Sequence, residues 1–85
     1  GINATLNFPN GITLDEENSR LFIADTNNRK IRVYDFQNKI IDCFLGENSN
    51  NPINSSCYFN INLNPPTFLA LDNKNGILYF TDIYS

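Results

Sequence analysis

Histidine, methionine and tryptophan are absent from the 85-residue chain, and only four glycines occur. Without histidine, the chain lacks the usual general base, any Ser–His or Cys–His pair and the commonest zinc ligand. The glycines are scattered at positions 1, 11, 46 and 76, so the sequence has no glycine-rich phosphate-binding loop. We therefore expect a non-enzymatic chain with no catalytic, cofactor-binding or metal-binding residues.

Positive charge is also scarce, with six Lys or Arg residues against nine Asp or Glu residues and a net charge of −3. Nucleic-acid-binding domains usually carry a basic stripe, whereas the only basic cluster here is Arg29, Lys30 and Arg32. No apolar run approaches the ~20 residues that cross a membrane. We expect neither a nucleic-acid partner nor a membrane span in this segment. The chain also begins without an initiator Met or a signal peptide, which an internal piece of a longer protein would explain.

Apolar and aromatic side chains are well represented, at 41% and 13% of the chain. These values suit a globular domain, and the many aromatic and β-branched residues favour β-strands. Asparagine fills sixteen positions. We attribute this bias to an AT-rich coding sequence and expect little function from it.

An internal repeat indicates the architecture. Residues 6–25 align without a gap on residues 63–82, at a shift of 57 residues, and eight of the twenty positions are identical. A fixed period of this size indicates a propeller or a solenoid. Each copy enters a short strand at a proline, passes through a polar turn such as Asn75-Gly76, and continues as a second, apolar strand. The strands are expected at residues 11–15, 20–25, 30–36, 40–45, 68–72 and 77–82. Since four short antiparallel strands make one propeller blade, the sequence predicts an all-β chain of about one and a half four-stranded antiparallel blades.

The first copy closely resembles an NHL repeat. Residues 6–12 read LNFPNGI and residues 21–32 read LFIADTNNRKIR, which match the family's Pro-Gly-apolar start and its Ala-Asp-Thr-x-Asn-x-Arg-Ile turn. The second copy departs from the pattern, because Phe68 replaces Gly11 and residues 78–82, LYFTD, also resemble YWTD propeller repeats. The resemblance implies a closed, usually six-bladed β-propeller in a larger protein. Residues 1–62 would form one NHL-type blade, and residues 63–85 the first half of the next.

The polar segment at residues 25–29 is the densest candidate for a ligand site, because Asp and Asn side chains supply oxygen ligands. A turn whose side chains cap local backbone groups explains the same residues. Asp82 takes the place of Asp25 in the second copy, and a residue repeated in each blade is expected to maintain the repeat. We therefore interpret Asp25, Asn28, Arg29 and Asp82 as structural turn residues.

Two other polar stretches have similarly simple interpretations. The acidic residues 15–17 could be paired catalytic carboxylates, but they lie in an expected hairpin turn, so we interpret them as solvated. The alternation along residues 30–36 could present a basic and aromatic surface to nucleic acid. We interpret it instead as the solvent-facing side of an outer strand, with Arg32 and Tyr34 directed toward water.

Cys43 and Cys57 are the only cysteines, and they bound a polar insertion at residues 43–57. The extra length of the 57-residue period coincides with this insertion. A bridge that closes a loop of about 15 residues stabilises a fold by roughly 3 kcal/mol in the chain-entropy model. Two free buried thiols, as in a cytosolic protein, are the alternative. We expect an intrachain disulfide between the two cysteines.

Asn3 and Asn54 each begin a glycosylation sequon, at residues 3–5 and 54–56. Both are expected to be glycan acceptors only if the protein is secreted. Asn54 is the better candidate, because it falls in the polar insertion.

Fold alone does not decide activity. We expect a non-enzymatic protein-interaction or structural module, with the remaining blades and other proteins as partners, in the extracellular space or the secretory pathway. The resemblance leaves two alternatives open. One is a secreted enzyme like the peptide-amidating lyase, with a metal held by histidines of other blades. The other is a cytoplasmic NHL adaptor or RNA-binding propeller, which a strongly basic surface on other blades would favour.

Overall fold

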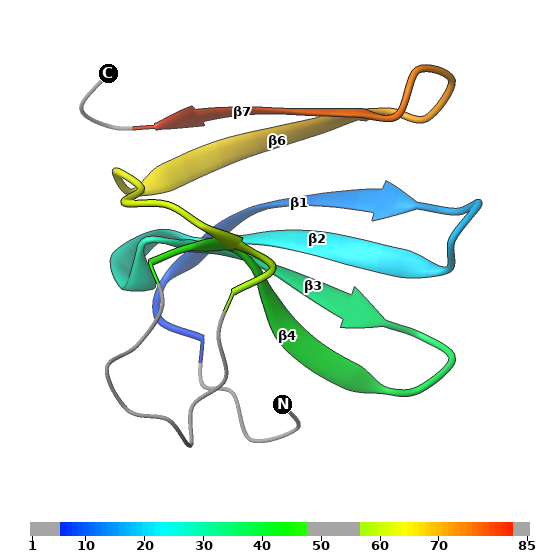
Figure 1. The fold of residues 1–85 in the computed structure, drawn as a ribbon, viewed down its shortest axis with the longest axis horizontal. Helices are drawn as coiled ribbons and strands as arrows, with labels where there is room; N and C mark the ends of the chain where they lie inside the picture. Colours follow the sequence, from blue (N-terminus) through cyan, green and yellow to red (C-terminus); the bar gives the residue numbers. More distant parts are fainter. Residues whose placement is uncertain (1–5, 48–56, 83–85) are drawn as a thin grey trace.

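The computed structural model describes residues 6–47 and 57–82, which form two β-sheets and no α-helix (Figure 1). The strands are β1 (Pro9–Asp15), β2 (Arg20–Asp25), β3 (Lys30–Asp35), β4 (Ile40–Gly46), β5 (Phe59–Asn60), β6 (Pro66–Asp72) and β7 (Ile77–Asp82). A 3-10 turn, η1 (Thr26–Asn28), joins β2 to β3. The expected all-β fold is confirmed, and each of the expected strands is present.

Two strands begin earlier than expected. β1 starts at Pro9 and β6 at Pro66, two residues before the positions expected from the sequence. Proline is tolerated as the first residue of a strand, where its missing N–H interrupts no ladder. The pairing register shifts just after each proline, before Gly11 in β1 and before Leu69 in β6. Each copy therefore enters its sheet through the same irregularity.

The first sheet has the order β1-β2-β3-β4-β5, and its first four strands are antiparallel neighbours, as expected for a blade. A fifth strand that the sequence did not predict, β5, pairs in parallel with the end of β4. A parallel pair requires a connection that returns the chain to the same end of the sheet. The cysteine-bounded insertion supplies that length. A strand of two residues leaves no periodic pattern, so the sequence could not predict it.

The second sheet repeats the first half of the first sheet. Leu14 lies opposite Leu21 across β1 and β2, and their counterparts 57 residues later, Leu71 and Leu78, lie opposite each other across β6 and β7. The internal repeat of the sequence is therefore also a repeat of pairing register.

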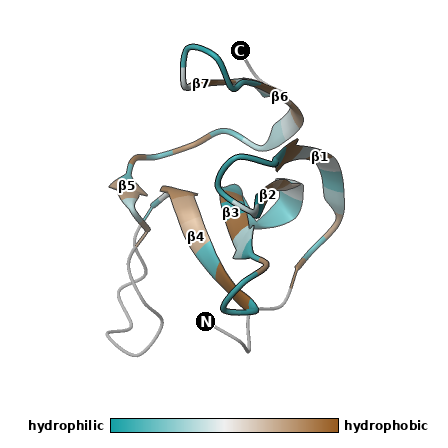
Figure 2. Cartoon of the chain, turned by 90° about the vertical axis from the view of Figure 1, so that its right-hand side faces the viewer, coloured by the Kyte–Doolittle hydropathy of each residue, from teal (hydrophilic) through white to brown (hydrophobic). Residues whose placement is uncertain are grey.

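The hydrophobic core lies between the two sheets. Phe22, Ile31 and Leu63 are almost completely buried. Leucines of the second sheet pack against this cluster: Leu69, Leu71 and Leu78. Hydrophobic residues follow the strands, notably β4, whereas the loops that face the viewer in Figure 2 are hydrophilic. Full burial of such a side chain contributes roughly 1.5–3 kcal/mol, and the partly buried leucines contribute less, so this contact stabilises the packing of the two sheets.

Gly11 lies at a close approach between β1 and β6. A β-carbon at Gly11 would run into the backbone carbonyl of Thr67 and lie 3.4 Å from the Cα atom of Phe68. The obstacle is backbone, which cannot rotate aside as a flexible side chain could. Glycine at this position therefore permits the close approach of the two sheets.

Gly11→Ala should destabilise the fold by about 1–3 kcal/mol, the usual cost of overpacking. Chemical denaturation of the full-length protein, followed by circular dichroism, measures the change. Gly76→Asn is the matched control, because nothing lies within 4 Å of a β-carbon at Gly76 and asparagine tolerates its φ of 68°. Equal stability of the two variants would contradict the close approach.

Candidate functional site

One polar motif recurs at four turns of the described chain. An aspartate ends a strand, and the asparagine three residues later donates its side-chain amide to that carboxylate over 2.8–2.9 Å. The next residue has a positive φ in every case, between 53° and 68°. The pairs are Asp15–Asn18, Asp25–Asn28, Asp35–Asn38 and Asp72–Asn75.

In the turns after β1, β3 and β6, the asparagine backbone N–H also donates to the same carboxylate, over 3.3–3.4 Å. The carboxylate thus binds the backbone and the side chain of one residue, which fixes the turn locally. Four of the sixteen asparagines therefore have a structural role in these turns. The signal was present in the sequence as a repeated Asp-x-x-Asn spacing at strand ends.

Hydrogen bonding in these turns favours the ionised aspartate. At Asp35 and Asp72, the side chain and backbone of the turn asparagine hold the pKa of the carboxyl below its usual value of 3.8. At Asp15, burial by itself would raise the pKa. Hydrogen bonds from Asn18 and Arg20 outweigh burial and leave the pKa of Asp15 lowered.

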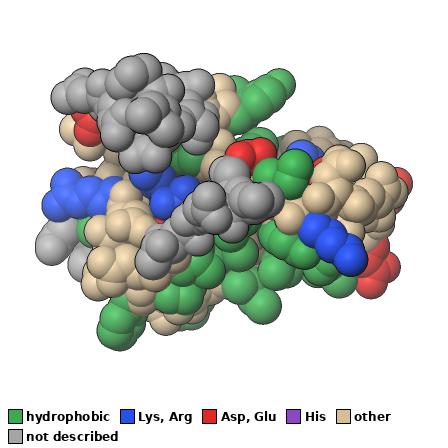
Figure 3. All heavy atoms as spheres, turned by 90° about the horizontal axis from the view of Figure 1, so that it is seen from below, with side chains coloured by type: hydrophobic (Ala, Val, Ile, Leu, Met, Phe, Trp, Pro, Cys, Tyr) green, Lys and Arg blue, Asp and Glu red, His purple; other side chains and the backbone are tan. Residues whose placement is uncertain are grey.

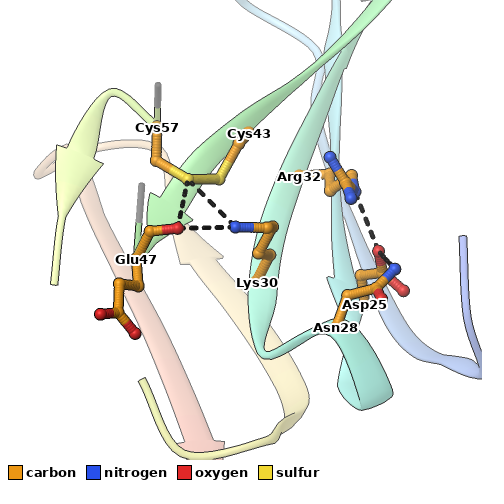
Figure 4. The surroundings of a disulfide bond; sticks show 7 residues. All are labelled: Asp25, Asn28, Lys30, Arg32, Cys43, Glu47 and Cys57. Atoms are coloured by element: carbon orange, nitrogen blue, oxygen red, sulfur yellow. Dashed lines mark hydrogen bonds and ion pairs between the residues drawn. A yellow bond between two sulfur atoms is a disulfide. The ribbon is translucent and has the colours of Figure 1, made fainter. Parts of the chain in front are cut away.

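The turn after β2 is the most deeply buried of the four. Asp25 is 0% exposed, and its carboxylate accepts a hydrogen bond from the Asn7 backbone N–H at 2.8 Å. It also accepts hydrogen bonds from Asn28 Nδ2 at 2.8 Å and from Arg32 Nε at 2.9 Å (Figure 4). One of these donors is a charged guanidinium, which makes the strongest kind of hydrogen bond to a carboxylate. The structure thus brings Asp25 and Asn28 together, as the turn interpretation requires.

The same turn connects other parts of the chain. Thr26 donates a buried hydrogen bond to the carbonyl of Pro66 at the start of β6, over 2.8 Å. Asn27 donates its backbone N–H to the carbonyl of Asn7, which precedes β1. Arg29 closes η1 in the left-handed conformation, with its N–H bonded to the carbonyl of Thr26. This turn therefore links the entry to β1, the β2–β3 connection and the second sheet.

Our interpretation of Asp15 as solvated is wrong. Asp15 is 2% exposed, and its carboxylate lies 2.7 Å from Nε of Arg20, the residue opposite it across β1 and β2. The Arg20 guanidinium also lies 4.9 Å from the ring centroid of Phe22. Strand register brings these residues together, and the sequence alone does not fix that register. Glu16 and Glu17 are exposed, as expected.

The interpretation of Arg32 as solvent-facing is also wrong. Its side chain is only 14% exposed and forms an ion pair with the buried carboxylate of Asp25, although Ile23 is the residue opposite it across β2 and β3. Alternation along β3 places Arg32 on one face of the strand, but does not reveal a buried carboxylate on that face.

The remaining predicted residues differ from Asp25 in their surroundings. Asp82, its counterpart in the second copy, has a buried Oδ1 with no hydrogen-bond partner in the part of the chain that the structure describes. Asn3 and Asn54, the expected glycan acceptors, lie outside the described residues.

Cys43 and Cys57 are joined by a disulfide, with their Cα atoms 4.6 Å apart (Figure 4). A bridge requires Cα atoms within about 7 Å. Both cysteines are buried, and the bond connects β4 to the residues just before β5. The backbone N–H of Tyr58 donates to the carbonyl of Cys43, and the Tyr58 ring stacks on Phe44 with centroids 5.9 Å apart.

Lys30 is a residue of this site that sequence reasoning missed. Its Nζ donates to the carbonyl of Glu47 at 2.8 Å and lies 3.8 Å from Cys57 Sγ. Loss of hydration lowers the pKa of Lys30, and the charge of Arg32 adds to this, while Glu47 and Asp25 act in the opposite direction. No spacing rule links a strand-initial lysine to a cysteine 27 residues later.

Within residues 6–47 and 57–82, no three His, Cys, Asp or Glu side chains are grouped so that they could hold a metal ion. No helix in those ranges is both long and apolar enough to cross a membrane. The chemistry that the described residues do offer is charge-assisted hydrogen bonding at the turns and a disulfide beside an ammonium group.

Curated proteins named NHL repeat-containing protein 2 are similar to the chain. The chain is 34% identical over 82 residues to the protein of Homo sapiens, 36% over 83 residues to that of Bos taurus, and 32% over 82 residues to that of Gallus gallus. Each alignment covers 96% of this chain and 11% of the relative, so the chain spans about a tenth of the length of the relatives it matches. No family model matches the chain, and no solved structure matches it at a significant level.

Asp25→Asn should destabilise the fold by about 3 kcal/mol, because it leaves the Arg32 guanidinium largely buried without a counter-charge. Asp35→Asn changes the same motif in an exposed turn and should have a much smaller effect. Urea denaturation of both variants measures the difference. Equal losses would mean that the buried ion pair is not what makes the Asp25 turn important.

The free energy of unfolding should fall in acid. Folding lowers the pKa of Asp15, Asp35 and Asp72, so the unfolded chain binds protons more tightly than the folded chain. The resulting stability is present above about pH 4 and is lost as the pH falls through the lower pKa values of the folded state. Denaturation at a series of pH values measures this loss. An Asp35→Asn, Asp72→Asn double variant should show a shallower acid decline, and an unchanged decline would exclude these turns as its source.

Proposed function

We propose that this NHL-repeat segment forms about one and a half blades of a closed β-propeller, which works as a non-enzymatic protein-interaction module in a larger protein. The NHL resemblance is confirmed by the curated relatives, which align with nearly the whole chain. The division of the described strands into one five-stranded sheet and one hairpin supports a blade at residues 1–62 and a half-blade at residues 63–85.

The observation that carries the proposal is an open apolar face whose repeat counterpart is packed. Leu69 and Leu71 of β6 pack on the core of the first sheet. Ile12 and Leu14 take the same positions in β1, and they are 64% and 45% exposed. Equivalent strands with equivalent side chains have equivalent packing requirements. If β1 packs on a preceding blade in the way that β6 packs on the first sheet, that blade would cover these residues.

The face of the second sheet that points away from the first sheet also exposes large apolar side chains. Phe22 lies beneath the second sheet and is 1% exposed, whereas its counterpart Tyr79 is 56% exposed. Phe68, the counterpart of Gly11, is 69% exposed. A following blade would cover both. Contacts of this kind, in which one face meets a different face, close into a ring when the rotation between units allows it.

Exposed surface remains for partners once the blade faces are covered. In the view from below Figure 1, hydrophobic side chains are exposed on the described part of the face, interspersed with charged ones (Figure 3). The Cys43–Cys57 disulfide supports an extracellular or secretory-pathway location, where such bonds persist.

Ile12→Asp tests the proposal directly in the full-length protein. If a preceding blade covers Ile12, the substitution buries an unpaired carboxylate and should lower the free energy of unfolding by roughly 3 kcal/mol. Gln37→Asp, in the exposed β3–β4 turn, is the control and should change little. Because Ile12 is 64% exposed in this chain, an effect no larger than that of Gln37→Asp would mean that no blade covers it.

A further inference from the structure

The Cys43–Cys57 bond lies beside a lysine ammonium group. Lys30 Nζ is 3.8 Å from Cys57 Sγ, and it is held there by a 2.8 Å hydrogen bond to the carbonyl of Glu47 (Figure 4). A cation at this distance favours the thiolate form of a sulfur over the thiol. We propose that Cys43, Cys57 and Lys30 form a thiol–disulfide exchange site for a dithiol reductant, in which Cys57 is the sulfur that leaves.

The fold fixes the position of Lys30. Lys30 opens β3 and pairs with Gly46 at the end of β4. A β-carbon at Gly46 would lie 2.9 Å from Lys30 Cγ, and Gly46 has a φ of 153°. Glycine therefore lets the lysine stem cross the end of β4 and bring its ammonium group to the sulfur. Pairing of β3 with β4 therefore positions the lysine stem.

The neighbouring charges leave Lys30 as the cation that acts on Cys57. Arg32 lies opposite Cys43 across β3 and β4, but its guanidinium is bound to Asp25 at 2.9 Å. The other charged residues adjoining the bond in the sequence are Asp42 and Glu47, and residues 48–56 contain no charged side chain. Both acidic residues are exposed, where water weakens their effect on the sulfur.

The two cysteines stay together when the bond is broken. Tyr58 N–H donates to the carbonyl of Cys43 at 3.1 Å, and Ile61 N–H donates to the carbonyl of Gly46 at 2.9 Å. The stacked rings of Phe44 and Tyr58 add an apolar contact across the same pair of segments. These contacts do not involve sulfur, so they persist after reduction and keep the thiols close enough for the bond to form again.

The exchange has two steps. A thiolate of the dithiol attacks Cys43 Sγ, the Cys43–Cys57 bond breaks, and its electron pair leaves on Cys57 Sγ, next to the Lys30 ammonium. The second thiolate of the reductant then attacks the reductant's other sulfur, which is bonded to Cys43 Sγ in the mixed disulfide. Cys43 leaves as a thiolate and takes a proton from water. The dithiol is oxidised to a disulfide, and the two cysteines are reduced by the same two electrons.

The test compares the two thiols in the reduced, folded full-length protein. Iodoacetamide alkylation is followed over a range of pH, and mass spectrometry gives the rate at each cysteine. The Cys57 thiol should titrate below the ordinary value of about 8.5 and below the Cys43 thiol. Equal titration of Cys43 and Cys57 in the unsubstituted protein would overturn the proposal, and this comparison needs no variant.

Three substitutions test whether the charge of Lys30 causes the low titration of Cys57 and the cleavage rate of the disulfide. Lys30→Met keeps the length of the stem and should return Cys57 to ordinary titration and slow cleavage of the bond by dithiothreitol several-fold. Lys30→Arg should preserve both properties. Lys74→Met, in the β6–β7 turn, is the control and should change neither. If Lys30→Met matches the unsubstituted protein in titration and cleavage, Lys30 has no role in exchange.

Discussion

The packing of the second sheet on Phe22 and Ile31 is the contact on which the rest of the structure depends. A two-stranded hairpin such as β6–β7 is marginally stable by itself, so its order comes from burial against the first sheet. The leucines that make the contact are Leu69, Leu71 and Leu78. Their counterparts in the first copy of the repeat are also apolar: Ile12, Leu14 and Leu21. A small residue at Gly11 allows the backbones to approach, and the buried hydrogen bond from Thr26 to Pro66 fixes how the sheets meet. The same contact, repeated around an axis, is what a propeller requires.

Polar interactions act at the two ends of this packed unit in different ways. The turns after β1, β3 and β6 lie at one end, where each aspartate binds its own asparagine (Figure 1). The opposite end holds η1, with its carboxylate shared among distant donors, and the disulfide with Lys30. Local turns need no tertiary context and stabilise each hairpin separately. The other end links β1, β2, β3 and β6, so it is sensitive to how the sheets are arranged.

Much of the fold could be predicted from the sequence, because its signals are local. The proline entry, the Asn75-Gly76 turn and the apolar run of β2 each indicate strand or turn without reference to the rest of the chain. The partners of Asp15, Arg32 and Lys30 could not be predicted, because they depend on the register of strand pairing and on where the insertion returns. β5 was missed for a related reason, since its two residues pair only because the chain has been brought back beside β4.

Hydrogen exchange at β7 in the full-length protein tests the central claim most directly. Among residues 6–47 and 57–82, β7 pairs only with β6, so no described strand covers its other edge. If β7 lies inside a propeller blade, a third strand covers that edge as β3 covers β2. Amides on both edges of β7 should then be protected to a degree comparable with those of β2. Rapid exchange of the alternate amides of β7 that point away from β6 would contradict the account.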